Sequence, residues 1–251
     1  MPSPLPTAER LCLYGDSHLA AAKLALDAGL VDQGRVQIEF FGAQGPEFRK
    51  MRHHPGKVIP DPDALEALHM VNGGARDLLK AEDFANYLFV GGRLRLHELF
   101  PPLLACRADP DRHLSVAIEA AVIDKWLTST RAYRVASDFA ARGARVWFSP
   151  ASFLTDGVAD RAGFGENSAA LNASEAEANA LWALVQRRMQ RDGVVLIRPP
   201  ANTIIQACLT RADFAVAGAA ESNDAVHKSP AYAALALTEV LGQLADARQS
   251  A

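Results

Sequence analysis

The chain is organised around one stretch, LCLYGDSH at residues 11–18. Four apolar residues run into a glycine, and a helix-forming run, LAAAKLAL, follows at residues 19–26. This order predicts a buried strand that leads through a tight turn into a helix. The turn would hold Ser17 at the start of the helix, where free backbone N–H groups and the helix dipole favour negative charge. Such a place suits a nucleophilic serine, although a helix cap formed by Asp16 or Ser17 explains the same pattern.

Four more apolar runs have the character of buried strands, and helical patterns separate them. The candidate strands are residues 36–41, 87–92, 144–148 and 193–198. The helical patterns are residues 113–142, as one or two helices with Asp111 as a candidate cap, a segment from the capping box of Ser174 and Glu177 to about Arg191, and residues 230–248. Buried strands that alternate with helices predict an α/β fold whose mainly parallel, five-stranded sheet has helices on both faces.

No linker rich in Pro, Gly or Ser divides the chain, so residues 1–251 are treated as a single domain. Residues 1–9 are expected to be flexible. Residues 43–63 and 155–172 are rich in glycine and polar residues and are expected to form two long loops. Because loops at the carboxyl ends of parallel strands build the binding site, we place both loops at the active rim.

The composition is that of an ordinary soluble globular protein, with 49% hydrophobic and 22% charged residues. A net charge of -3 gives no reason to expect nucleic acid or an anionic membrane as a partner. For the short basic cluster at residues 49–54, we favour the interpretation of a solvated loop over that of a ligand-facing patch. The chain lacks a signal-peptide pattern and a window long enough for a transmembrane helix. We therefore expect a cytoplasmic protein without membrane insertion.

Cysteine and histidine patterns argue against structural metals and disulfides. The three cysteines are too few and too scattered for a disulfide framework, and none lies in a C-x-x-C pair. Cys12 and Cys208 have apolar neighbours and are expected to be core thiols. The histidines lack metal-ligand spacing and the glycine pattern at residues 163–168 is incomplete. Neither a metal nor a cofactor is expected.

A second informative stretch, ESNDAVHKSP at residues 221–230, precedes the last helical pattern. A serine hydroxyl becomes a good nucleophile when a base removes its proton, and histidine, oriented by a carboxylate, is the usual base. Asp224 and His227 are three residues apart, so one turn can put both side chains on the same side. An aspartate that caps the last helix and an exposed histidine explain this segment equally well.

Together, the Gly15-Asp16-Ser17 turn and the Asp224-x-x-His227 segment resemble the SGNH (GDSL-like) hydrolase family. The resemblance implies a flavodoxin-like three-layer α/β/α sandwich in which the last loop returns over the first strand. It also implies serine-dependent hydrolysis of esters. In that reaction Ser17 is the nucleophile, His227 the base and Asp224 the carboxylate that orients the histidine.

The remaining family positions stabilise the oxyanion, and here the match is partial. Gly42 follows the second strand, as the family pattern requires. After the third strand the family usually has Gly-x-Asn-Asp, whereas this chain has GGRL at residues 91–94, which puts Gly92 and Arg93 at these positions. Arg93 is a candidate for holding the oxyanion or an acidic substrate, because arginine donates hydrogen bonds and carries a fixed charge. It is equally compatible with a surface residue of a site that no longer catalyses, and Gly42 with an ordinary turn glycine.

The sequence therefore predicts a serine esterase or deacylase that acts on a small-molecule or carbohydrate ester through an acyl-enzyme on Ser17. Two alternatives stay open: an O-acyltransferase that passes the acyl group to a sugar, and a binding protein of the same fold that has lost catalysis. His18, beside the serine, is expected to face solvent or pack at the rim. No oligomeric state follows from the sequence.

Overall fold

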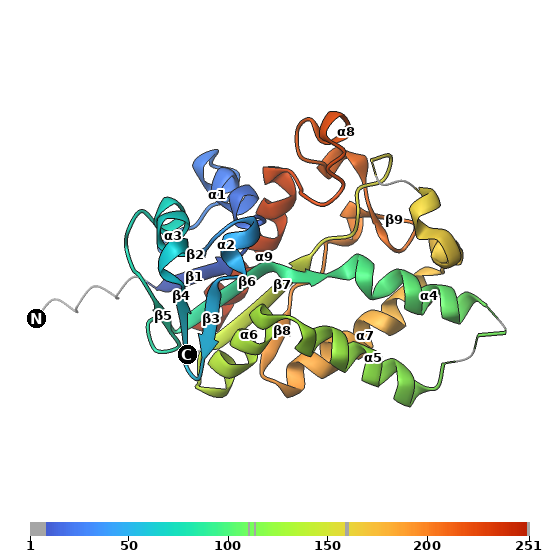
Figure 1. The fold of residues 1–251 in the computed structure, drawn as a ribbon, viewed down its shortest axis with the longest axis horizontal. Helices are drawn as coiled ribbons and strands as arrows, with labels where there is room; N and C mark the ends of the chain where they lie inside the picture. The colour runs from blue at the N-terminus through green and yellow to red at the C-terminus, as the bar shows by residue number, and fades with distance from the viewer. Residues whose placement is uncertain (1–8, 110, 113, 159–160, 250–251) are drawn as a thin grey trace, which may run out of the picture.

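A five-stranded, all-parallel sheet forms the centre of the protein, in a computed structural model that describes residues 9–109, 111–112, 114–158 and 161–249 (Figure 1). The strands, in spatial order, are β2 (Gln37–Gly42), β1 (Arg10–Gly15), β6 (Asn86–Arg95), β7 (Arg145–Ala151) and β8 (Val194–Leu196). Gly15 pairs with both Gly42 and Val90, so the carboxyl ends of β1, β2 and β6 meet at one edge. The predicted α/β class and parallel sheet are confirmed.

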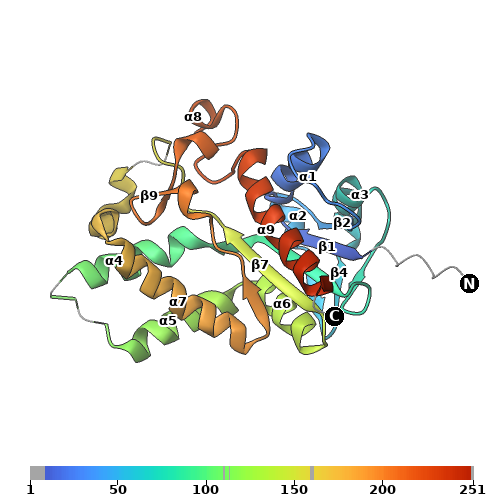
Figure 2. The ribbon, with the colours of Figure 1, turned by 180° about the vertical axis from the view of Figure 1, so that it is seen from behind.

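Helices cover both faces of this sheet. α1 (Leu19–Asp27) and α9 (Pro230–Gln249) contact each other and cover one face, which Figure 2 shows from behind. The other face is covered by a layer of four helices, α4 (Phe100–Ala108), α5 (Val116–Ser129), α6 (Arg131–Ala141) and α7 (Glu175–Arg191). Successive strand residues point to opposite faces, so Leu11 and Leu13 of β1 pack with α1 and α9 while Cys12 and Tyr14 pack in the other layer. The molecule is a three-layer α/β/α sandwich.

The helical pattern at residues 113–142 forms two helices. Thr130 separates α5 from α6, and its side chain accepts a hydrogen bond from the N–H of Tyr133 as the cap of α6. Ser115 caps α5 by accepting the N–H of Ile118, so Asp111 is not the cap. The capping box of Ser174 and Glu177 at the start of α7 is confirmed.

The expectation of a long irregular loop at residues 43–63 is wrong. This segment forms α2 (Gly45–Phe48), the hairpin of β3 (Met51–His54) and β4 (Lys57–Pro60), and the 3₁₀ turn η1 (Pro62–Ala64). β5 (Leu79–Lys80) joins β4 to make a three-stranded antiparallel sheet. Pro55 and Gly56, a pair typical of a loop, form the turn of this hairpin. Met51 and Val58 are buried on the inner face of the hairpin.

The second expected loop, residues 155–172, consists mainly of the 3₁₀ element η3 (Arg161–Asn172), which packs against α4. Residues 159–160 lie outside the described residues, as do residues 1–8 of the segment expected to be flexible. In the described part of the chain, η3 contributes no side chain to the cavities around Ser17 described below.

The remaining elements are α3 (Leu65–Asn72), η2 (Leu96–Glu98), η4 (Ala201–Thr203), β9 (Ile204–Ile205), β10 (Leu209–Thr210), η5 (Ala212–Phe214) and α8 (Ala219–Ser222). Cys12 and Cys208 are buried and unpaired, which confirms them as core thiols. Burial raises the pKa of both thiols. Within the described residues, no helix combines the length and the apolar character that crossing a membrane requires.

Candidate active site

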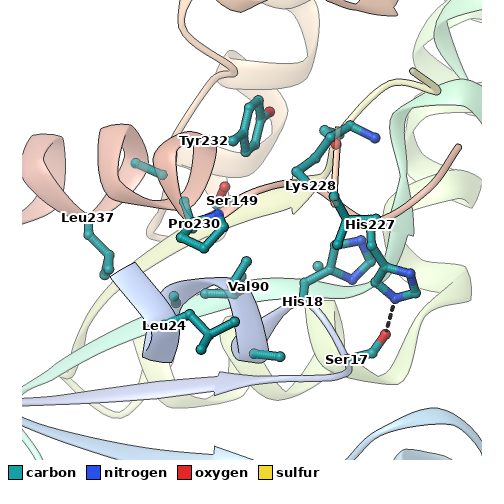
Figure 3. Close-up of a pocket in the computed structure, with 18 of the residues that line it drawn as sticks. Ser17, His18, Leu24, Val90, Ser149, His227, Lys228, Pro230, Tyr232 and Leu237 are labelled. Carbon is teal, nitrogen blue, oxygen red and sulfur yellow. Dashed lines mark hydrogen bonds between the residues drawn. The ribbon is translucent and has the colours of Figure 1, made fainter. Parts of the chain in front are cut away.

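Ser17, His227 and Asp224 form a continuous chain of hydrogen bonds at the carboxyl edge of the sheet. Ser17 follows β1, and its Oγ lies 2.7 Å from Nε2 of His227 (Figure 3). Nδ1 of the same ring lies 2.7 Å from Oδ2 of Asp224. When Nδ1 carries the ring proton and donates it to Asp224, Nε2 is free to accept the serine O–H. The fold thus joins three candidates that lie at opposite ends of the sequence.

The loop that carries this pair is held by its own aspartate. α8 ends at Ser222, and its C-cap residue Asn223 has a positive φ of 52°. Oδ1 of Asp224 then accepts the N–H groups of Val226 and His227, each at 3.0 Å. Burial disfavours the carboxylate, but hydrogen bonds from the backbone and ring of His227 outweigh it and lower the pKa of Asp224. The ionised carboxylate holds the His227 ring in its orientation.

Lys228 anchors the same loop from inside. Its side chain is buried, and Nζ donates hydrogen bonds to the carbonyls of Ala225 at 2.8 Å and Val226 at 2.9 Å. Burial lowers the pKa of Lys228 to about 7, against the attraction of Asp224. A lysine in a polar segment is usually exposed, so the sequence contains no signal for this role.

His18 lies inside the site, and the expectation of a solvent-facing or rim position is wrong. Its side chain is 14% exposed, Nδ1 lies 2.7 Å from Oδ1 of Asp16, and its ring centroid is 5.2 Å from that of His227. Nε2 of His18 is buried and has no hydrogen-bond partner among the described residues. A second aspartate–histidine pair thus stands beside Ser17. α1 has no side-chain cap, so neither Asp16 nor Ser17 serves as one.

Asp16 connects this turn to the irregular end of β6, just after Gly91. Its side chain is 8% exposed overall, and its Oδ2 accepts the N–H of Arg93 at 3.0 Å. Burial raises the pKa of a carboxyl, but the bonds from His18 and Arg93 prevail and lower the pKa of Asp16. A Cβ at Gly91 would lie 2.6 Å from Nδ1 of His18 and 2.7 Å from Oδ1 of Asp16. Only glycine leaves room for the pair here.

The three candidate oxyanion residues have different positions. Gly42 is buried in the sheet, where a Cβ would lie 1.9 Å from the carbonyl oxygen of Gly15, and it is not among the residues that line the cavities around Ser17. Gly92 allows close packing against Ala132 of α6, because a Cβ there would lie 2.5 Å from that methyl group. Arg93 does line a cavity together with Ser17. The glycines shape the backbone, and Arg93 reaches the site.

Among the residues that the structure describes, three cavities have Ser17 in their lining. An apolar cavity of about 310 Å³ extends from Ser17 and His227 between α1 and α9, with Leu24 and Leu237 on its walls and Val90 beneath (Figure 3). A second apolar cavity of about 220 Å³ lies between α1 and α3. A polar cavity of about 480 Å³ opens on the other side. Its lining includes Ser17, His227, Arg93, Arg95 and Asn223.

The chemistry available at this site is that of a serine hydroxyl with a base, a carboxylate and backbone donors. The N–H of Ser17 has no acceptor among the described residues and lies just before α1, where a developing negative charge is favoured.

No cluster of His, Cys, Asp and Glu in the described part of the chain has the arrangement of a metal site. No protein-family model matches the chain, and comparison with curated proteins and with solved structures gave no significant match.

Proposed function

We propose that this protein is a serine hydrolase of ester bonds, with the SGNH-like arrangement of Ser17, His227 and Asp224 as its catalytic groups. The observation that carries the proposal is the 2.7 Å contact between Ser17 Oγ and His227 Nε2, since nucleophile and base must be within hydrogen-bond reach. The second 2.7 Å contact, from His227 to Asp224, supplies the group that orients the base.

In the proposed reaction, His227 removes the proton of Ser17 while Oγ attacks the carbonyl carbon of the ester. The tetrahedral oxyanion is stabilised by the N–H of Ser17, with the Arg93 guanidinium as a further candidate donor. When the intermediate collapses, His227 gives the proton to the departing alcohol and an acyl-enzyme remains. A water molecule then attacks the acyl carbon while His227 takes its proton, and when the bond from this carbon to Ser17 Oγ breaks, His227 returns the proton to Oγ and the carboxylic acid leaves.

The apolar cavity between α1 and α9 is the proposed place for the acyl group. It begins at Ser17 and runs along α1 as far as Leu24. Ser17 and Leu24 are seven positions apart, and at the rise of an α-helix this separation spans about 10 Å, the length of an acyl chain of about eight carbons. An ester of a medium-length acyl chain is therefore the substrate that fits the site best.

A fluorophosphonate probe and p-nitrophenyl acetate test the proposal. Wild type should take the label and hydrolyse the ester, whereas Ser17→Ala should take no label and lose at least about 10³-fold in kcat. Ser168→Ala, which alters an exposed serine of η3, is the matched control and should behave like wild type. If Ser17→Ala hydrolyses the ester as fast as wild type, the proposal fails.

The same assay separates the two alternatives. For an O-acyltransferase, addition of a sugar acceptor should raise the rate of p-nitrophenol release. For a binding protein that has lost catalysis, wild type should neither take the label nor turn over the ester. Replacement of the expected asparagine by Arg93 is what makes this last outcome worth testing.

A further inference from the structure

Five arginines gather in a pocket next to the candidate active site. The pocket has a volume of about 340 Å³ and lies between α2, the end of β6 and the start of α6. Its basic side chains are Arg49, Arg93, Arg95, Arg131 and Arg134, and we refer to it as the arginine pocket. Glu98 is the one acidic residue in its lining. Arg49, one residue of the basic cluster at residues 49–54, thus lines this pocket.

Four of the five arginines have no ion-pair partner in the described part of the chain. Glu98 pairs with Arg95 at 2.8 Å, whereas Arg131 donates to the carbonyls of Arg49 and Met51, and Arg134 to the carbonyl of Thr128. The guanidinium groups of Arg49 and Arg93 have no hydrogen-bond or ion-pair partner in the described part of the chain. Burial, with the nearby charges of Arg49 and Arg95, lowers the pKa of Arg93. Guanidinium groups that repel one another in a shared pocket are stabilised by an anion.

The N-terminus of α6 also favours an anion in the arginine pocket. α6 is 11 residues long, and Thr130, Arg131 and Ala132 at its beginning line the pocket. The side chain of Thr130 satisfies the N–H of Tyr133, while the N–H groups of Arg131 and Ala132 have no acceptor among the described residues. A helix start with free N–H groups, surrounded by arginines, favours an anion with several oxygens.

Arg93 and Arg95 connect this pocket to the nucleophile, because both also line the polar cavity that contains Ser17 and His227. Arg93 has a left-handed backbone with φ 63°, following Gly91 at 66° and Gly92 at 56°. This turn, held by the bond from the Arg93 N–H to Asp16, carries the side chain to the boundary between the two cavities. A substrate bound at Ser17 therefore lies between the apolar cavity on one side and the arginine pocket on the other.

We infer that the arginine pocket binds a phosphate group carried by the leaving alcohol or thiol of the substrate, with the acyl chain in the apolar cavity. The inference rests on the proposed function for the position of the scissile bond. The anion itself is recognised by the five arginines and the start of α6. The shared chemistry is an acyl ester or thioester with a phosphorylated leaving group.

A binding experiment tests the pocket without using activity. Inorganic phosphate is titrated into wild type, Arg49→Gln and Arg187→Gln at constant ionic strength, and the melting temperature is followed. Phosphate should raise it saturably in wild type and in Arg187→Gln, which removes an exposed arginine of α7 outside the pocket. In Arg49→Gln the phosphate Kd should be about tenfold higher. Absence of a phosphate-specific rise in wild type, or an equal Kd in Arg49→Gln, would overturn the inference.

Paired substrates then distinguish the source of the phosphate. We compare octanoyl glycerol 3-phosphate with octanoyl glycerol, and octanoyl-coenzyme A with the neutral octanoyl-N-acetylcysteamine. A preference of about tenfold in kcat/KM for the phosphorylated member of either pair, reduced in Arg49→Gln, supports the inference and identifies the carrier. Equal rates within both pairs contradict it. If Ser17 takes no fluorophosphonate label, the proposed function fails while the phosphate titration still decides whether the pocket binds phosphate.

Discussion

The backbone N–H of Arg93 donates a 3.0 Å hydrogen bond to Oδ2 of Asp16, which ties the irregular end of β6 to the turn after β1. The other oxygen, Oδ1, accepts from both the N–H and Nδ1 of His18, at 3.3 Å and 2.7 Å. One buried carboxylate thereby positions a histidine beside the nucleophile and an arginine at the edge of the polar cavity. In this turn Asp16 holds the neighbouring backbone and His18 in place, and Ser17 is the proposed nucleophile.

Replacing Asp16 with asparagine should disrupt this arrangement. Both carboxylate oxygens accept hydrogen bonds, and an amide turns one of these acceptors into a donor. We expect Asp16→Asn to lower the free energy of unfolding by about 1–3 kcal/mol, measured by urea denaturation, and to slow labelling of Ser17. Asp27→Asn, at an exposed position on α1, is the control and should stay within about 0.5 kcal/mol of wild type. Equal stability of the two variants would contradict this role of Asp16.

Gly91→Ala should be more destabilising than an alanine at another left-handed glycine. Gly91 and Gly73 both have φ 66°, but an added Cβ meets His18 and Asp16 at Gly91 and nothing within 4 Å at Gly73. Gly73→Ala therefore measures the backbone strain alone, about 1 kcal/mol or more. Gly91→Ala should add the steric cost and displace His18. Urea denaturation of both variants checks the difference, and an equal loss would show that the close approach at Gly91 has no energetic importance.

Lys228 should make stability depend on pH. Its pKa is lowered to about 7 in the folded state, below the ordinary value of 10.5, so between these values the unfolded chain binds more protons than the folded one. The cost of burying the charge is present in full below pH 7 and is relieved as the pH rises. The free energy of unfolding of wild type minus that of Lys228→Met should therefore increase from pH 7 to 10, by up to about 1.4 kcal/mol per pH unit. A difference that does not change with pH would contradict the lowered pKa.

A bulky side chain on α9 should change the preferred acyl length. Ala236 lines the apolar cavity, and Ala236→Phe would fill part of its volume of about 310 Å³. We expect kcat/KM for p-nitrophenyl octanoate to fall at least about tenfold while the value for the acetate ester changes little, because a short chain does not reach Ala236. Ala231→Phe, at an exposed position of α9, controls for the added ring. If both Ala236→Phe rates fall together, the acyl group does not occupy this cavity.

Much of the architecture can be predicted from the sequence because the signals are local. The apolar runs at residues 11–14 and 144–148 lie in β1 and β7, and the capping box of Ser174 and Glu177 begins α7. The hairpin of β3 and β4 is not predictable in this way, since its strands are short and rich in charge and each contributes few buried residues. Short amphipathic strands with a Pro-Gly turn resemble a loop when their partner surface is unknown.

The candidate site likewise combines features that can be predicted from local sequence with features that appear only in the folded chain. The parallel sheet and the place of Ser17 at the end of β1 can be predicted from the sequence, since strand and helix periodicity and a turn glycine are properties of neighbouring residues. It also pointed to Asp224 and His227 through a spacing within a single turn. The folded structure is needed to see that His227 reaches Ser17, that Asp16 contacts Arg93, and that the arginines of three segments share one pocket. These contacts join residues far apart in the chain, and their energies come from burial and from charges brought together by the fold, which no local pattern records.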